Sequence, residues 1–234
     1  PAIEAVANAD AIQRSPATRL AGVFTHLAKA DEPDDPFTNP QLAAFDAALD
    51  LLDAAGHRPP MVHAANSAGL IAHPAARFTM VRAGIAIYGI APSTELAAAS
   101  AALRPALSLH ARVSMVKRLE AGDGVSYGQR HHFLRPATVA TVPIGYADGV
   151  PRRLFQCGGE VLIGGVRRPI VGVVTMDQLM VDCGDDSVAV GDEVILIGTQ
   201  GDQTITANEW GDKLGTIGYE IVCAISVRIA RRSM

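Results

Sequence analysis

The sequence has few cysteines and no long run of either charged or apolar residues. Its three cysteines, Cys157, Cys183 and Cys223, are odd in number and widely spaced, which disfavours a disulfide framework or a zinc site and predicts buried thiols in a reducing, cytoplasmic compartment. No apolar stretch approaches the roughly 20 residues of a membrane span, and the start at Pro1 does not resemble a basic secretory signal. The formal net charge of -4, without a long basic run, gives no support to binding of nucleic acid or of a membrane surface.

The overall composition is typical of a soluble globular protein. Of the 234 residues, 49% are hydrophobic and 19% are charged. The length is enough for one large domain or two ordinary ones. Because the chain begins abruptly at a proline without an initiator methionine, we expect either a fragment of a longer protein or a processed terminus.

The first part of the chain alternates short apolar strands with helices. Residues 1–19 are loosely helical, and strands are predicted at residues 20–26, 61–65 and 80–88. A helix is expected from the N-cap Asn39, with Pro40 at its first position, to Gly56. Such alternation implies parallel strands covered by helices. A whole (β/α)8 barrel takes roughly 250 residues, so residues 1–104 are predicted to form only the C-terminal part of a TIM-type barrel.

The pattern changes at Leu103-Arg104-Pro105. From there onward strands follow one another with glycine turns between them, which predicts a second, all-β domain, a β-barrel or β-sandwich, over residues 105–234. The expected strands are residues 107–117, 137–142, 160–163, 169–174, 179–181, 193–197 and 221–229. One helix is expected to interrupt them, starting at a capping box formed by Thr206 and Glu209 and ending at Gly215.

The stretch from Met61 to Tyr88 is the most informative about function, because two predicted strands end in it. Small residues and hydroxyls there leave backbone N–H groups uncovered, which is what a bound phosphate needs. Between the strand ends stands Arg82 in an otherwise apolar run. Burying its guanidinium costs free energy, so an acceptor is expected beside it. Taken alone, the pattern favours an ordinary interpretation, in which Arg82 pairs with a carboxylate and Asn66 is a helix N-cap.

The β-rich part contains further candidates, each of them weak alone. Tyr127 and Tyr146 stand between small residues in turns, Met176-Asp177-Gln178 follows a β-branched run, and Tyr219 precedes the last expected strand. A tyrosine beside glycine is usually a packing residue. In the first part, His26 at a strand end is more typical of a core histidine than of a catalytic group.

Taken in order, these motifs resemble the pyridoxal-phosphate-dependent alanine racemases of fold type III. The motifs are Thr25-His26, Ala65-Asn66-Ser67, Met80-Val81-Arg82-Ala83-Gly84-Ile85, Ser126-Tyr127-Gly128, Gly145-Tyr146-Ala147-Asp148-Gly149, Met176-Asp177-Gln178 and Tyr219-Glu220. The resemblance covers essentially the whole chain and the last two thirds of a family member. Agreement of so many motifs in the right order rarely arises by chance.

The resemblance implies pyridoxal 5'-phosphate as the cofactor and assigns roles around it. Arg82 would face the pyridine nitrogen, and because arginine does not yield its proton, that nitrogen stays largely unprotonated and the ring is a weaker electron sink. His26 would pack near the ring and link to Arg82, and Asn66 would belong to the same cradle. The cofactor phosphate would be held by Ser67, Gly84, Ile85 and Tyr219. No metal is expected.

The resemblance also implies racemisation of L- and D-alanine, supplying D-alanine for peptidoglycan. Tyr127 would be the catalytic acid/base on one face of the substrate, and because a phenol has a pKa near ~10, cationic neighbours must lower it. The Met176 N–H would meet the substrate carboxylate, with Asp177 as a polar neighbour and Tyr146 at the entrance. In the family this tyrosine comes from the opposite subunit, which implies a head-to-tail homodimer with shared sites.

One departure from the family pattern matters. The route needs a lysine that forms the internal aldimine and acts as second base, and it lies in a segment that this sequence does not contain. Lys29, Lys117 and Lys213 fall in none of the motifs. We therefore expect little or no activity from this polypeptide alone. The alternatives are a broad-specificity or serine racemase of the same architecture, and a non-catalytic fragment that acts in association.

Overall fold

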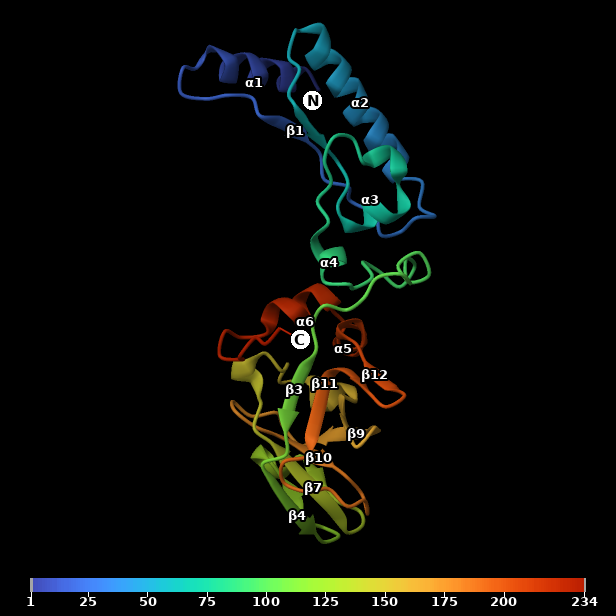
Figure 1. Ribbon diagram of the computed structural model, residues 1–234, viewed down its shortest axis with the longest axis vertical. Coiled ribbons are helices and arrows are strands. Elements are labelled where there is room, and N and C mark those ends of the chain that lie inside the picture. Colours follow the sequence, from blue (N-terminus) through green and yellow to red (C-terminus); the bar gives the residue numbers. More distant parts are fainter. Residues whose placement is uncertain (1, 234) are drawn as a thin grey trace. The chain divides into compact units, whose positions relative to one another are not determined.

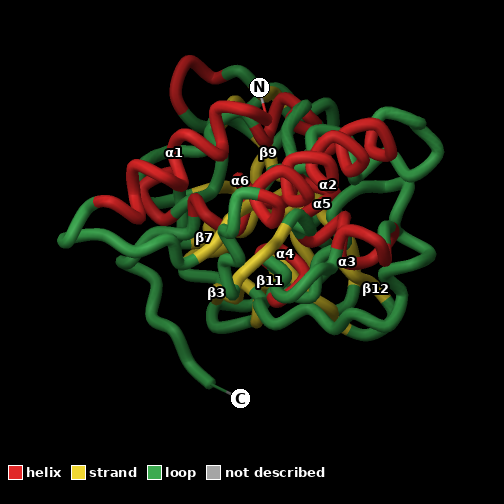
Figure 2. Tube along the Cα trace, turned by 90° about the horizontal axis from the view of Figure 1, so that it is seen from above, coloured by secondary structure: helices red, strands yellow, loops and turns green. Residues whose placement is uncertain are grey.

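The computed structural model describes residues 2–233. The chain divides into two compact units, Pro1–Ala106 and Leu107–Met234. In Figure 1 the first unit is coloured from blue to green and the second from green to red. Figure 2 shows the helices in red, and the strands that it labels all belong to the second unit.

The first unit is built from two β/α segments. Strands β1 (Gly22–Phe24) and β2 (Met61–His63) pair in parallel. A Cβ at Gly22 would lie 2.9 Å from the Met61 carbonyl oxygen, so no side chain fits there. The helices are α1 (Ala2–Arg14), α2 (Thr38–Ala54), α3 (Ser67–Ala72), the 3-10 turn η1 (Pro74–Ala76) and α4 (Gly84–Ile87). The core beneath them includes the buried residues Leu27, Leu42, Phe45, Ala64, Ala65 and Ala76.

Two expectations for the first unit are corrected. The strand predicted at residues 80–88 does not form, and its second half is the helical turn α4. Two backbone hydrogen bonds connect residues 79–82 to β2 and the turn after it. The Thr79 N–H donates to the Val62 carbonyl, and the Arg82 N–H donates to the Ala65 carbonyl. These bonds are three residues apart, whereas a regular parallel ladder bonds at every second residue. In addition, α2 has Phe37 rather than Asn39 as its N-cap, and Asp35 accepts the Phe37 N–H at 2.8 Å.

The second unit is rich in sheet, as predicted. Its strands are β3 (Leu109–Arg112), β4 (Met115–Leu119), β5 (Gly124–Val125), β6 (His131–His132), β7 (Ala137–Val142), β8 (Glu160–Ile163), β9 (Val166–Val171), β10 (Leu179–Asp182), β11 (Glu193–Gln200) and β12 (Gln203–Ile205). The main sheet has the order β12-β11-β8-β9-β10-β7-β4, and β3 pairs with β11. Because β3 leads directly into β4, these two strands link both halves of the sheet. The remaining elements are the 3-10 turns η2 (Tyr127–Gln129), η3 (Tyr146–Asp148) and η4 (Leu154–Cys157) and the helices α5 (Ala207–Leu214) and α6 (Gly218–Ala224).

Several boundaries in the second unit differ from the prediction. The stretch 107–117 breaks into two strands at Val113, where the chain leaves β11 for β7. The strand predicted at residues 221–229 is wrong, because Gly218–Ala224 is helical and packs on α5. All three cysteines are free, but only Cys183 is buried, so the expectation of buried thiols fails for exposed Cys223.

The predicted α5 helix is confirmed with one change. The Thr206 hydroxyl accepts the Glu209 N–H at 3.0 Å, as a capping box requires. The Glu209 carboxylate does not return to the cap. It binds Arg167 on β9 at 2.7 Å and Lys213 at 3.2 Å instead.

Candidate functional site

The guanidinium of Arg82 lies where the carboxyl ends of β1 and β2 meet. It donates to the carbonyl oxygens of Thr25 at 3.1 Å and Ala64 at 3.0 Å. It also contacts the Nδ1 atoms of His26, at 3.2 Å, and His63. All of these described bonds go to carbonyls or imidazoles and none to a carboxylate, so the expected pairing with an acidic side chain is wrong. The positive charge is therefore held in place without being neutralised.

His63 and Phe24 belong to this cluster, although the sequence did not single them out. Their rings stack with centroids 5.1 Å apart and planes 9° apart, and the Arg82 guanidinium carbon lies 5.6 Å from the Phe24 ring centre. Burial and the nearby Arg82 cation both lower the pKa of His63. A neutral His63 can accept a hydrogen bond from Arg82. The signal in the sequence is a histidine that ends a strand, which alone is not distinctive.

The turn after β2 brings four predicted residues together. Asn66 is the N-cap of α3, and its side chain accepts the Gly69 N–H at 2.9 Å, as the ordinary interpretation predicted. The hydroxyl of buried Ser67 accepts the Ala86 N–H at 3.2 Å, which ties the start of α3 to α4. A Cβ at Gly84 would meet only the Ser67 hydroxyl, at 4.0 Å, so the approach to this turn is open. Ile85, the next residue of α4, is buried.

Tyr127 lies at the tip of a tight turn between β5 and β6. Its side chain is 73% exposed. The residue before it, Ser126, has φ 64° and ψ -177°, and Gly128 after it has φ 70°. The exposed side chain projects from the turn, as the sequence predicted for a tyrosine among small residues.

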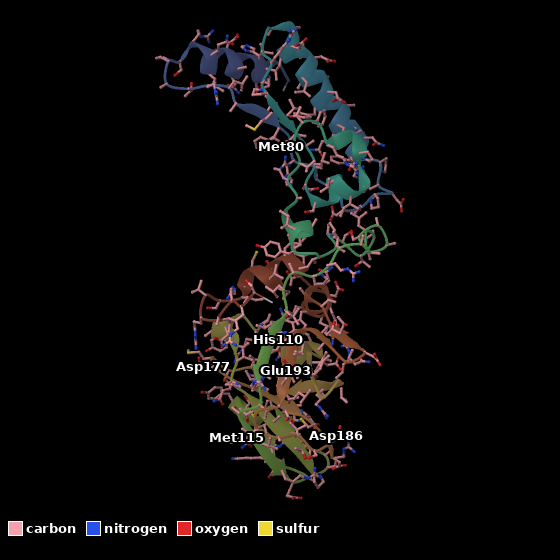
Figure 3. All side chains as sticks on the ribbon, viewed as in Figure 1. Met80, His110, Met115, Asp177, Asp186 and Glu193 are labelled. Carbon is pink, nitrogen blue, oxygen red and sulfur yellow. The ribbon has the colours of Figure 1, made fainter. Side chains whose placement is uncertain are left out.

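Tyr146, Met176 and Asp177 lie on two turns that pack against each other. The Tyr146 N–H donates to the Thr175 carbonyl at 2.9 Å, and the next N–H donates to the Met176 carbonyl at 3.0 Å. A Cβ at Gly145 would overlap the same carbonyls, so this close approach needs glycine. All three predicted side chains are exposed, and Figure 3 shows Asp177 at the surface of its unit.

Asp148 organises these turns, and sequence reasoning gave it no role. Its buried carboxylate accepts the Gly145 N–H at 2.9 Å, and its carbonyl accepts the Ser226 N–H at 3.0 Å. Arg228 bridges the carboxylates of Asp148, at 3.4 Å, and Asp177, at 2.7 Å. One aspartate therefore joins the Tyr146 turn, the Asp177 turn and the segment after α6.

Tyr219 lies in the first turn of α6 and is half-buried. A hollow of about 470 Å³ beside this helix is lined by Arg152, Arg153 and Glu220 among others. It includes none of the predicted site residues, so we assign it no part in the site. Among residues 2–233, no cluster of three or more His, Cys, Asp or Glu side chains could hold a metal ion.

The predicted site residues fall into two groups, one in each unit. The first unit brings together His26, Asn66, Ser67, Arg82, Gly84 and Ile85 at its strand ends. The second unit carries Tyr127, Tyr146, Met176, Asp177 and Tyr219. The first group holds the Arg82 cation, and the second holds the Asp177 carboxylate and the exposed side chains of Tyr127 and Tyr146.

Comparison with known proteins connects both groups to one class of enzyme. Residues 1–92 match the model of the alanine racemase N-terminal domain, and residues 106–233 match that of the C-terminal domain. The chain is 54% identical over 213 residues to an alanine racemase of Symbiobacterium thermophilum, covering 91% of this chain and 56% of that one. It is 48% identical over 228 residues to that of Thermobifida fusca, covering 96% and 60%.

Solved structures agree. The alanine racemase of E. faecalis matches with a TM-score of 0.90 and 40% identity, over 98% of this chain and 60% of that chain. A structure of the Bacillus anthracis alanine racemase with bound L-Ala-P matches with a TM-score of 0.88 and 43% identity, over 94% and 56%.

This chain belongs to the alanine racemase family. It spans 56% to 60% of the length of these relatives, which is less than the two thirds expected from the motifs. In the described part of the chain, no helix is long and apolar enough to cross a membrane.

Proposed function

We propose that this chain forms part of an alanine racemase, which interconverts L- and D-alanine with pyridoxal 5'-phosphate and so supplies D-alanine for peptidoglycan. The observation that carries the proposal is Arg82, a cation held by carbonyls and imidazoles with no carboxylate among its described bonds. Such a group is ready to meet an acceptor atom of a ligand. Because the chain belongs to the alanine racemase family, we assign that acceptor to the pyridine nitrogen of the cofactor.

The residues present fit this cofactor. Arg82 offers a permanent donor, and the open backbone at Gly84, beside the Ser67 hydroxyl, leaves room for a phosphate. We assign the phosphate to Ser67, Gly84, Ile85 and Tyr219, and the ring to Arg82, His26 and Asn66. When bound, the cofactor supplies the electron sink that makes the Cα proton of the amino acid acidic.

The chain's own residues then have distinct tasks. Arg82 keeps its proton at the guanidinium, and His63, whose pKa is lowered, accepts a hydrogen bond from it without adding charge. The Tyr127 hydroxyl gives or takes the Cα proton on one face of the substrate. The Met176 N–H binds the substrate carboxylate, with Asp177 beside it and Tyr146 at the entrance.

We further propose that the first unit is the later part of a (β/α)8 barrel, residues 1–104, followed by the β-domain at 105–234. None of the motifs holds a lysine. Because the chain spans little more than half of its relatives, the lysine that binds the cofactor is assigned to the part of a racemase that this chain does not match. The 234 residues alone are therefore expected to be inactive.

Two named ligands of relatives support a small amino acid as substrate. The Bacillus anthracis enzyme holds L-Ala-P, and a Clostridium difficile enzyme forms a complex with cycloserine. The test is to express the complete reading frame, load it with pyridoxal phosphate, and follow D-alanine formed from L-alanine. Tyr127→Phe should lower the rate at least about a hundredfold, with Tyr88→Phe as the control. A preference for serine would favour the broad-specificity alternative, and no turnover of any amino acid would favour the non-catalytic one.

We propose that the active protein is a homodimer in which Tyr127 of one subunit serves the cofactor bound by its partner. Co-expression of Tyr127→Phe and Arg82→Ala subunits with different tags tests this. If sites are shared between subunits, each heterodimer holds one intact site, and random pairing restores about a quarter of the activity. If both residues act within one chain, every site keeps one defect and no activity returns.

A further inference from the structure

We propose that Ser126, clamped against Gly172 and Val173, is a positioning residue that sets the direction of the Tyr127 phenol for proton transfer. The inference rests on the proposed function, because it assumes that Tyr127 is the catalytic tyrosine. Ser126 stands in one of the motifs but was given no role there, and Gly172 and Val173 lie outside all of them.

The first observation is local strain. Among residues 2–233, the only non-glycine residues with positive φ are Phe78, Ser126 and Gln129. Two of the three flank Tyr127. Ser126 has φ 64° with ψ -177°, a region that residues with a side chain rarely occupy. Glycine would adopt this conformation without strain, yet the position carries a serine.

The second observation is the contact that the serine makes. Its hydroxyl donates to the Val173 carbonyl at 2.6 Å, which links the tyrosine turn to the segment just after β9. A Cβ at Gly172 would lie 2.8 Å from the Ser126 Cβ, so the two backbones approach too closely for any larger residue. On the other side of the turn, a Cβ at Gly124 would lie 2.9 Å from the Gln129 Cβ. The turn is therefore held from both sides.

The third observation is that Tyr127 has little packing around it in its own chain. Within its own chain the Tyr127 side chain is 73% exposed, so packing inside that chain does little to choose its rotamer or to hold its backbone. A proton donor must nevertheless lie within hydrogen-bond reach of the reacting carbon, and a misplacement of about 1 Å can cost a factor of about a hundred. What the chain itself can do to aim this side chain, it therefore does through the backbone of the turn. The strained Ser126 fixes the direction in which the Tyr127 Cα–Cβ bond points.

Two substitutions test the contacts of Ser126 with Val173 and Gly172, and each has a matched control. Ser126→Ala removes the hydroxyl, and its control is Ser114→Ala, which removes a similar bond to the Thr141 carbonyl at 3.1 Å in the same unit. Gly172→Ala adds a methyl group at φ 67° against Ser126. Its control is Gly164→Ala, at φ 65° with nothing within 4 Å of the added atom.

The decisive measurement is the kinetic isotope effect with α-deuterated alanine, on the holoenzyme expressed from the complete reading frame. The enantiomers are equally stable, so kcat/KM stays equal in both directions in every variant, but the isotope effect reports each proton transfer separately. For Ser126→Ala and Gly172→Ala we expect kcat to fall about tenfold to a hundredfold. The isotope effect should rise for one enantiomer only. A purely structural role would lower the active fraction and leave both isotope effects unchanged, which would overturn the proposal.

A second measurement needs no activity. With 3-fluorotyrosine incorporated, the fluorine resonance of Tyr127, assigned from Tyr127→Phe, should shift or split in both variants and stay constant in both controls. An unchanged resonance in the variants overturns the proposal. If the resonance shifts in the variants but the wild-type holoenzyme does not racemise alanine, the proposed function is refuted. The catalytic role of Ser126 is then refuted with it.

Discussion

Replacing Arg82 by alanine should open the strand ends of the first unit. The side chain joins the carbonyl of Thr25, at the end of β1, to that of Ala64, at the end of β2. A hydrogen bond from a charged donor contributes about 1.5–3 kcal/mol. Because both bonds are only partly buried, we take the lower value for each and expect a loss of about 3 kcal/mol in the local free energy of opening.

Hydrogen exchange of backbone amides measures this opening directly. The Thr25 N–H, bonded to the His63 carbonyl at 3.2 Å, and the Ala65 N–H, bonded to the Ala76 carbonyl at 3.1 Å, lie beside the two acceptors. A loss of about 3 kcal/mol corresponds to exchange about a hundredfold faster. Arg82→Lys keeps the charge but not the fork of donors, so an intermediate effect is expected.

Arg77→Ala is the matched control. Arg77 also donates to a carbonyl in the same unit, that of Leu70 at 2.8 Å, but it is exposed and joins no strands. Its removal should change exchange at the strand ends less than threefold or so. If Arg82→Ala has an equally small effect, the bonds from Arg82 to the two carbonyls do not hold the strand ends together, and the reasoning is refuted.

Three further predictions concern electrostatics. Asp148→Asn, which removes the charge that faces Arg228, should lower the free energy of unfolding by about 1–3 kcal/mol, measured by urea unfolding with the single tryptophan as probe; an unchanged midpoint would contradict this. The pKa of Glu209 is lowered from 4.5, first by the hydrogen bond of Arg167. The ion pair therefore stabilises the fold above pH 4.5, and the loss of unfolding free energy caused by Glu209→Gln should shrink as the pH falls below that value. His63 should titrate below 6.5 by NMR. Because the unfolded chain then binds more protons, the first unit should lose stability as the pH falls below that value, and a midpoint above 6.5 would refute the assignment.

Physical reasoning from sequence located the Arg82 cluster but not its partners. A permanent cation in an apolar run requires an acceptor, and the structure supplies carbonyls from strands far away in the sequence. Nothing local to Arg82 encodes those contacts. The carboxylate that local statistics favour is absent from its described bonds because the ends of two parallel strands already provide lone pairs.

The failed strand predictions have a common cause. The stretches 80–88 and 221–229 are apolar and β-branched, which favours strands when read alone. In the structure each has a helical turn that buries an isoleucine, Ile85 in α4 and Ile221 in α6. Contacts from elsewhere decide between the two conformations, the Ser67 hydroxyl for α4 and the packing of α5 for α6. Tertiary packing overrides local preference in short elements.

The two proposed catalytic groups are held in the same way, although they lie in different units. Arg82 is fixed by carbonyls of strand ends, and Tyr127 by the strained backbone of Ser126 and its bond to Val173. In the proposed homodimer the two groups at one site come from different subunits, so no contact within one unit can correct a misplaced group in the other. Each unit must therefore define its own group rigidly. Bonds to backbone carbonyls serve this purpose in both units, and at Arg82 the imidazoles of His26 and His63 add to them.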